Sequence, residues 1–243
     1  SGFLSPIIER MDSMKIDTMT RAELASYFDY SLLGPNCRQA EFDQFLANAR
    51  QYGVYSVAIN GAWVPYAVEH LRDTGIKVGS TAGFPFGQMA VTAKREEARI
   101  ALSQGAEEID YVLHIGRLLD HDYHYIADEM REMVLLCHSQ GAVAKVILEN
   151  CYLGREENRG ACEIAVEQGI DFVKTSTGFG PGGAEADDVR LMKQVVGDRV
   201  LVKAAGAMRT LDKTAQMIEL GASRIGSGFV PDILNEFSAR YSR

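Results

Sequence analysis

Residues 169–176 read Gly-Ile-Asp-Phe-Val-Lys-Thr-Ser, a glycine followed at once by a short apolar run. Glycine just past a helix end readily adopts the left-handed conformation that closes the helix. A run rich in Val and Ile is typical of a buried strand. The same arrangement occurs at six more glycines: Gly53, Gly75, Gly105, Gly141, Gly197 and Gly221. With the run YFDYSLL near residues 27–33, these seven turns predict eight strands.

The stretches between the predicted strands have helical patterns; residues 38–52, for example, place Phe42, Phe45, Leu46 and Ala49 on one stripe. Helices are predicted over residues 38–52, 89–104, 122–140, 155–168, 185–196 and 210–220. Strands alternating with helices indicate parallel pairing through right-handed crossovers. We therefore predict a single (β/α)8 barrel over residues 27–243, with an N-terminal helical extension over residues 1–26. A doubly wound open sheet is the structural alternative.

The composition narrows the classes of function. Lys and Arg total 25 and Asp and Glu total 33, a net charge of −8 that disfavours nucleic acid and anionic membrane surfaces as partners. No apolar stretch has the roughly 18 residues of a membrane span, and the N-terminus lacks a signal-peptide core. The four cysteines, Cys37, Cys137, Cys151 and Cys162, form no CxxC pair, so a reducing cytoplasm is expected.

Three charged residues stand out at the carboxyl ends of predicted strands, where barrels of this type hold their chemistry. Lys174 and Lys203 lie on adjacent apolar strands, and Asp110 lies on the fourth strand at the same offset from its glycine as Lys174. Two neighbouring ammonium groups repel each other, which favours a neutral amine on one of them. The functional interpretation is a Schiff-base lysine with an acid–base carboxylate. The alternative is a structural ion-pair network.

Other strand ends supply candidates for a substrate pocket. Glycines follow strands six to eight, and their backbone N–H groups are suited to an anion such as phosphate. Further pocket candidates are Ser31, Asn60, Lys145 and Phe229. His121, Asp122 and His124 are interpreted as a solvated helix start rather than metal ligands, and no metal or other cofactor is expected.

The run FVKTSTGFGPGGA closely resembles the active-lysine segment of the deoxyribose-phosphate aldolase family, which are class I aldolases. FDYSLLGP, GFPFG, EEIDYVLHIG, KVILENCYL, CEIAVEQG and VKAAGAMRT match in the same order, over roughly residues 27–228. The resemblance implies a cofactor-free barrel that reversibly cleaves 2-deoxyribose 5-phosphate to glyceraldehyde 3-phosphate and acetaldehyde. It implies Lys174 as the Schiff-base lysine, Lys203 as the second lysine and Asp110 as the acid–base residue. It also implies a homo-oligomer, a dimer.

The resemblance further implies phosphate contacts at Gly178, Gly206 and Gly226, and backbone N–H groups at Ala207 and Gly228 are added to this phosphate site. Here the sequence departs from the family. Ala207 replaces a usual glycine, and Gly228 and Phe229 stand where the family has two hydroxyl residues. The reaction type is therefore better supported than the substrate. Three interpretations stay open: the family's reaction, the same chemistry on an unphosphorylated or differently substituted sugar, and a non-catalytic binding barrel.

Overall fold

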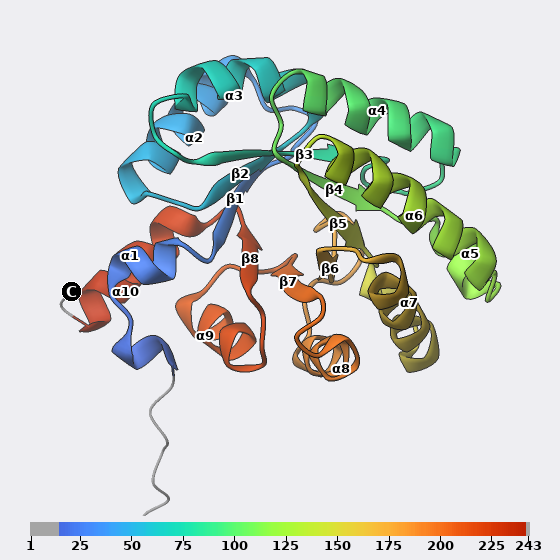
Figure 1. The fold of residues 1–243 in the computed structure, drawn as a ribbon. Coiled ribbons are helices and arrows are strands. Elements are labelled where there is room, and N and C mark those ends of the chain that lie inside the picture. The colour runs from blue at the N-terminus through green and yellow to red at the C-terminus, as the bar shows by residue number, and fades with distance from the viewer. Residues whose placement is uncertain (1–14, 242–243) are drawn as a thin grey trace, which may run out of the picture.

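Eight parallel strands close into a barrel in the computed structural model, which describes residues 15–241. Each strand pairs with the next in sequence, and β8 returns to β1 with Phe28 opposite Ile225. Figure 1 shows the strands at the centre with the helices arranged around them. The strands are β1 Phe28–Leu32, β2 Ser56–Ile59, β3 Lys77–Ala82, β4 Glu108–Val112, β5 Val143–Ile147, β6 Phe172–Lys174, β7 Leu201–Ala205 and β8 Arg224–Ser227. The predicted barrel is confirmed, and the open sheet is wrong.

The helices follow the strands in alternation. The α-helices are α1 Arg21–Ala25, α2 Gln39–Tyr52, α3 Val64–Leu71, α4 Val91–Ser103, α5 Ile115–Leu119, α6 Tyr123–Ser139, α7 Arg155–Gln168, α8 Ala186–Val196, α9 Leu211–Glu219 and α10 Val230–Tyr241. Three short 3-10 helices are η1 Lys15–Thr18, η2 Gly61–Trp63 and η3 Asn150–Tyr152. All six predicted helices are present, and α3, α5 and α10 are additions that the sequence pattern did not indicate.

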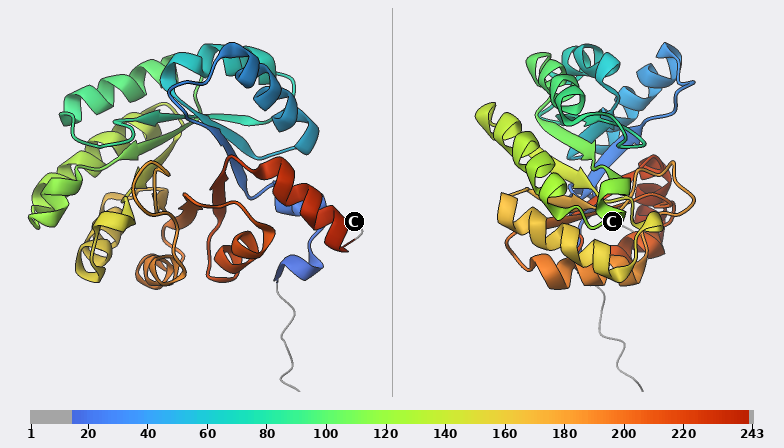
Figure 2. Two further views of the ribbon diagram at one scale, coloured as in Figure 1. Left: turned by 180° about the vertical axis from the view of Figure 1, so that it is seen from behind. Right: turned by 90° about the vertical axis from the view of Figure 1, so that its right-hand side faces the viewer.

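The N-terminal segment packs on the barrel rather than standing apart from it. Within residues 15–26, η1 contacts α9, and α1 lies beside α10, as Figures 1 and 2 both show. Ile16, Leu24 and Ala25 are buried in the hydrophobic core. Residues 1–14 of the predicted extension lie outside the described part of the chain.

The alternation of side chains along each strand separates two environments. In β4, Ile109 and Tyr111 belong to the hydrophobic core, whereas Glu108 and Asp110 contact charged groups from other strands inside the barrel. Successive side chains of a strand point to opposite faces. The apolar set therefore packs against the helices, and the barrel interior is left to a set of buried charges.

Candidate active site

Two lysines share one carboxylate at the centre of the barrel. Lys174 ends β6 and pairs in register with Lys203 of β7. The Nζ atoms of both lysines lie 2.7 Å from Oδ2 of Asp110, and all three side chains are at most 3% exposed. The structure thus brings together the three residues that the sequence analysis singled out.

More charged groups surround this trio. Lys145 of β5 lies 3.0 Å from Oδ1 of Asp110 and 3.2 Å from Oδ2 of Asp29, and it also contacts Glu108. Lys203 Nζ lies 2.5 Å from Oδ2 of Asp29. Each of the three lysines therefore shares a carboxylate with at least one other lysine. We call this set of seven residues the interior network: Asp29, Glu108, Asp110, Lys145, Lys174, Lys203 and Arg224.

Burial and neighbouring charges act in opposite ways on these groups. Burial lowers the pKa of Lys174, repulsion from Lys203 adds to this, and the attraction of Asp110 opposes it, which leaves the pKa at about 8. Repulsion from Lys203, the cause expected from the sequence, is thus present but smaller than burial. For Asp110, burial acts to raise the pKa, but the lysines outweigh it and hold the pKa well below its usual range. At neutral pH the site combines an easily deprotonated amine with an ionised carboxylate.

A cavity of about 210 Å³ opens above the two lysines. Its wall includes Lys174, Lys203 and most of the residues expected at the substrate: Ser31, Gly178, Gly206, Ala207, Gly226, Gly228 and Phe229. Thr177, Phe179, Met208 and Arg209 also line it. The glycine-rich turns after β6, β7 and β8 therefore border the same cavity as the amines.

The turn after β7 is strained at the position where the family usually has glycine. Ala207 has a φ of 55°, in the left-handed region that side chains disfavour. The preceding Gly206 has a φ of 81°. Two consecutive residues of this kind turn the chain sharply at the cavity wall, which gives a physical reason for the family's pair of glycines.

The turn after β8 differs from the family in its side chains. The Phe229 side chain is 42% exposed, and the Arg209 guanidinium lies over its ring, 5.3 Å from the centroid. Ser227 donates its hydroxyl to the carbonyl of Met208 and accepts from the N–H of Phe229 at 2.9 Å. The one hydroxyl that remains in this turn is thus engaged with the backbone.

Two predicted pocket residues lie elsewhere. Asn60 does not line the cavity; its amide donates to the Leu33 carbonyl and its side-chain oxygen accepts from Thr81. Lys145 lies among the carboxylates of the interior network, and it is 1% exposed. Each of these side chains is held by its own polar contacts. The side chain of Asn60 bonds to its own edge of the barrel, and three carboxylates hold Lys145 in the interior.

The site residues predicted from the sequence leave out three members of the interior network. Asp29 lies two residues before Ser31. Glu108 lies two residues before Asp110, and Arg224 lies two residues before Gly226. A spacing of two keeps a strand residue on the same face. Once Ser31, Asp110 and Gly226 are expected in the interior, this spacing is the signal that would have found them.

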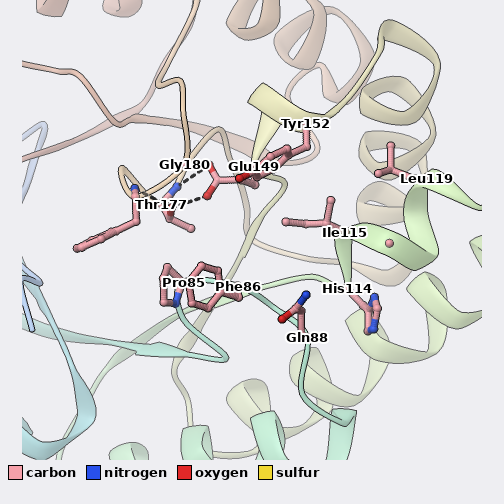
Figure 3. Close-up of a pocket in the computed structure, with 12 residues that line it drawn as sticks. Pro85, Phe86, Gln88, His114, Ile115, Leu119, Glu149, Tyr152, Thr177 and Gly180 are labelled. Atoms are coloured by element: carbon pink, nitrogen blue, oxygen red, sulfur yellow. Dashed lines mark hydrogen bonds between the residues drawn. The ribbon is translucent and has the colours of Figure 1, made fainter.

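A second cavity of about 270 Å³ lies beside the first (Figure 3). Thr177 and Phe179 line both cavities. In the second cavity, Glu149 accepts the backbone N–H of Thr177 at 3.1 Å and also its hydroxyl. Glu149 itself has a φ of 57° and is 2% exposed. This buried carboxylate fixes the start of the β6–α8 loop.

The histidine-rich segment forms the start of a helix, as expected. Asp122 caps α6 by accepting the N–H of Tyr125, and His121 contacts Glu157 at 3.0 Å. Within residues 15–241, no group of three or more His, Cys, Asp or Glu side chains is placed to hold a metal ion. In the same residues, no helix has both the length and the apolar character that crossing a bilayer requires.

The chain belongs to the DeoC/LacD family of aldolases, whose family model matches residues 32–230. The deoxyribose-phosphate aldolase of Thermococcus kodakarensis is 46% identical over 211 residues, covering 86% of this chain and 94% of the relative. That of Caldanaerobacter subterraneus subsp. tengcongensis is 46% identical over 215 residues, covering 88% and 93%. A tetrameric deoxyribose phosphate aldolase from Aeropyrum pernix has a similar structure, with a TM-score of 0.85 and 28% identity over 91% of this chain and 93% of that one. The resemblance inferred from the sequence is confirmed.

Proposed function

We propose that this aldolase reversibly cleaves 2-deoxy-D-ribose 5-phosphate to D-glyceraldehyde 3-phosphate and acetaldehyde through a Schiff base on Lys174. The observation that carries the proposal is a cavity-lining amine with a pKa of about 8 beside an ionised carboxylate. A lysine with an ordinary pKa is almost fully protonated at pH 7 and is a poor nucleophile. Membership of the DeoC/LacD family supports the same chemistry.

The reaction begins at the open-chain sugar. Neutral Lys174 attacks the C1 aldehyde to form a carbinolamine, which takes up a proton from solvent and loses water to give a protonated imine. A base removes the proton of the C3 hydroxyl, the C2–C3 bond breaks, and its electron pair moves into an enamine that the imine nitrogen stabilises. Glyceraldehyde 3-phosphate leaves. The enamine is then protonated at C2, and water releases acetaldehyde and regenerates the amine.

Asp110 and Lys203 serve the proton transfers. Asp110 contacts Lys174 at 2.7 Å, so it accepts a proton directly or through a water molecule and returns it to C2. Lys203 lies against the same carboxylate oxygen and keeps it ionised between these transfers. At the far end of the substrate, backbone N–H groups at Gly178, Gly206, Ala207, Gly226 and Gly228 would receive the phosphate.

The test is chemical trapping joined to a substrate assay. Incubation with acetaldehyde and borohydride is expected to leave an ethyl group on Lys174, which peptide mass spectrometry locates. Cleavage of 2-deoxyribose 5-phosphate is expected in the wild type and absent in Lys174→Met. Labelling of surface lysines alone, or cleavage by the methionine variant, would contradict the assignment. Absence of both trapping and cleavage would favour the non-catalytic binding barrel.

A second substrate deserves measurement because of one observation. Phe229 lines the cavity next to the glycines proposed to bind the phosphate, and the hydroxyl of Ser227 in the same turn is engaged with the backbone. The alternative substrate is an unphosphorylated or differently substituted sugar with the same retro-aldol chemistry. A kcat/KM for free 2-deoxyribose equal to or above that for the phosphate ester would favour it.

We also propose that the chain forms a homo-oligomer in the cytoplasm. The resemblance to the family implies a dimer, whereas the Aeropyrum pernix relative is tetrameric. The four cysteines are unpaired, which fits a reducing compartment. Light scattering on the purified protein measures the oligomeric state, and a monomer would contradict the proposal.

A further inference from the structure

The interior network continues below the lysines to an arginine. Arg224, the first residue of β8, donates Nη1 to Asp29 at 2.5 Å and Nη2 to Glu108 at 3.1 Å. Its side chain is 8% exposed, and its guanidinium lies 3.6 Å from the ring centroid of Tyr55. Arg224 does not line the cavity that contains Lys174. Arg224 takes part in none of the reaction steps described above.

Two routes of alternating charge connect this arginine to the reactive amine. The first runs from Arg224 through Glu108 and Lys145 to Asp110. The second runs from Arg224 through Asp29 and Lys203 to Asp110. Each step is an ion pair between buried side chains. Any change of charge at Arg224 is therefore transmitted to the carboxylate that contacts Lys174, through a medium that screens poorly.

The charges of the network do not balance. Four side chains are basic and three are acidic: Lys145, Lys174, Lys203 and Arg224 against Asp29, Glu108 and Asp110. From β2, the uncharged Ser56 donates its hydroxyl to Asp29, and from β3 the uncharged Thr81 pairs in register with Asp110. Lys15, Tyr27 and Lys193 line the opening on the far side of Arg224. With every group ionised, the seven side chains carry a net charge of +1, so one positive charge has no carboxylate to match it.

The number of carboxylate contacts indicates which basic group loses its proton most readily. Lys145 contacts three carboxylates, while Lys203 and Arg224 each contact two. Lys174 contacts only Asp110, which it shares with the other two lysines. A guanidinium does not lose its proton in proteins. The excess therefore falls on a lysine, and the lysine with the fewest carboxylate partners is the one at the cavity.

We propose that Arg224 is a positioning residue for the reaction. Its permanent positive charge pairs with Asp29 and Glu108, and Lys174 is therefore the amine that has no carboxylate to itself. The proposal rests on the proposed function in that Lys174 is the lysine that forms the imine. Without the fourth positive charge, three lysines match three carboxylates, and Lys174 loses its proton only at a higher pH. The arginine acts through Asp29, Glu108 and Asp110 and touches no substrate.

The experiment measures the titration of Lys174 without using turnover. Cyanate reacts with neutral amines, so the rate of carbamylation of the Lys174 peptide, followed by mass spectrometry across pH 6–11, gives its midpoint. Arg224→Met removes one positive charge and is expected to raise the midpoint by about one pH unit. Glu108→Gln is isosteric, removes one negative charge and is expected to lower it by a similar amount. The double variant restores the charge count and is expected to return near the wild-type midpoint.

A buried ion pair outside the network provides the matched control. Lys94 and Glu129 contact each other with both side chains 0% exposed. Glu129→Gln is expected to leave the midpoint of Lys174 unchanged, because it perturbs a buried pair without altering the network's charge. A merely structural role for Arg224 would lower stability in all variants without opposite shifts.

The outcomes separate the two proposals. Shifts of Arg224→Met and Glu108→Gln in the same direction, or no shift in either, would overturn the role of Arg224. Should Arg224→Met fail to fold, Glu108→Gln decides alone: a lower midpoint supports the proposal and an unchanged midpoint overturns it. Acetaldehyde trapping in the wild type tests the proposed function separately, since cyanate reports the amine whether or not the protein is an aldolase.

Discussion

Lys203 is the residue whose removal most directly tests how the reactive amine is tuned. Its positive charge repels Lys174 and lowers the pKa of that lysine. It also contacts Asp110, whose negative charge raises the pKa of Lys174. In Lys203→Leu the repulsion disappears and Asp110 is freed to attract Lys174 more strongly. Both changes raise the pKa of Lys174. We expect the pH at which imine formation is half-maximal to rise by about one unit, and the rate at pH 7 to fall about tenfold.

The control is a strand lysine outside the network. Lys77 of β3 pairs with Glu107 at 2.6 Å, and its side chain is 43% exposed. Lys77→Leu is expected to leave the pH profile of trapping unchanged. An unaltered profile in Lys203→Leu would remove that residue from the tuning of Lys174.

Phe229 allows the phosphate end to be tested at a single position. In Phe229→Ser a hydroxyl returns to the turn, and one hydrogen bond to a charged group is worth about 1.5–3 kcal/mol. We expect the KM for 2-deoxyribose 5-phosphate to fall about 10- to 100-fold, with little change for free 2-deoxyribose. Gly228→Ser is the less favourable site, because an added Cβ would lie 3.3 Å from the Ser31 carbonyl oxygen.

Phe229→Leu separates the two consequences of losing the aromatic ring. It removes the aromatic ring over which the Arg209 guanidinium lies and adds no hydroxyl. Equal KM values for the leucine and serine variants would show that the hydroxyl contributes nothing to phosphate binding. The cavity end would then suit a less polar substituent.

At the scale of single residues, the sequence predicted that Lys174, Lys203 and Asp110 lie together, but it predicted only part of their surroundings. Lys174, Lys203 and Asp110 are conspicuous because each interrupts an apolar run. Arg224 and Glu108 follow or precede polar residues, so nothing marks them as buried. Their burial depends on the pairing of β8 with β1 and of β4 with β5. These pairings join residues that are distant in sequence.

Among the elements, the ends of helices were predicted well because one residue type governs them. All seven glycines identified from the sequence have positive φ, between 58° and 104°. The short helices were missed for an equally local reason. Helix α5 has only five residues, and α3 and α10 both begin with Val-Pro, a pair that also suits a loop. Closure of the barrel is a property of all eight strands together and has no signal in any one of them.

The β6–α8 and β7–α9 loops meet closely enough for a test at the scale of elements. The N–H of Ala184 donates to the carbonyl of Gly206 at 3.0 Å, and a Cβ at Gly183 would overlap the backbone of Gly206. Gly183→Ala is therefore expected to push the two loops apart and raise the KM for the phosphate ester at least tenfold. Trapping of acetaldehyde on Lys174 is expected to continue, because that lysine lies in β6 itself.

Gly141→Ala is the matched control for this prediction. Gly141 closes α6 with a φ of 68° and has no atom within 4 Å of an added Cβ, so the change costs stability at a distance from the cavity. Its KM is expected to remain at the wild-type value. A normal KM in Gly183→Ala would show that the apposition of the loops does not shape the phosphate site.

For the molecule as a whole, the interior network lowers the pKa of Lys174 at a cost in folding stability. The pKa of Lys174 is about 8 in the fold, against 10.5 for a lysine exposed to water, a difference worth about 3 kcal/mol. Because the folded pKa is the lower one, the protonated lysine opposes folding below pH 8, and stability rises as the pH rises from 8 to 10.5. Lys145 differs, since its three carboxylates raise its pKa in spite of burial, so its charge favours the fold.

Two substitutions of equal size should therefore have opposite effects on the free energy of unfolding. Lys174→Met leaves three bases and three carboxylates in balance, and at pH 7 we expect a gain of about 1–3 kcal/mol. Lys145→Met removes the cation that three buried carboxylates share, and we expect the free energy of unfolding to fall by about 3–5 kcal/mol. Urea unfolding at pH 7 and at pH 9.5 measures both; the gain of Lys174→Met should shrink at pH 9.5, where the wild-type amine is already neutral. If both variants lose stability equally at both pH values, side-chain packing rather than the charge imbalance governs the interior.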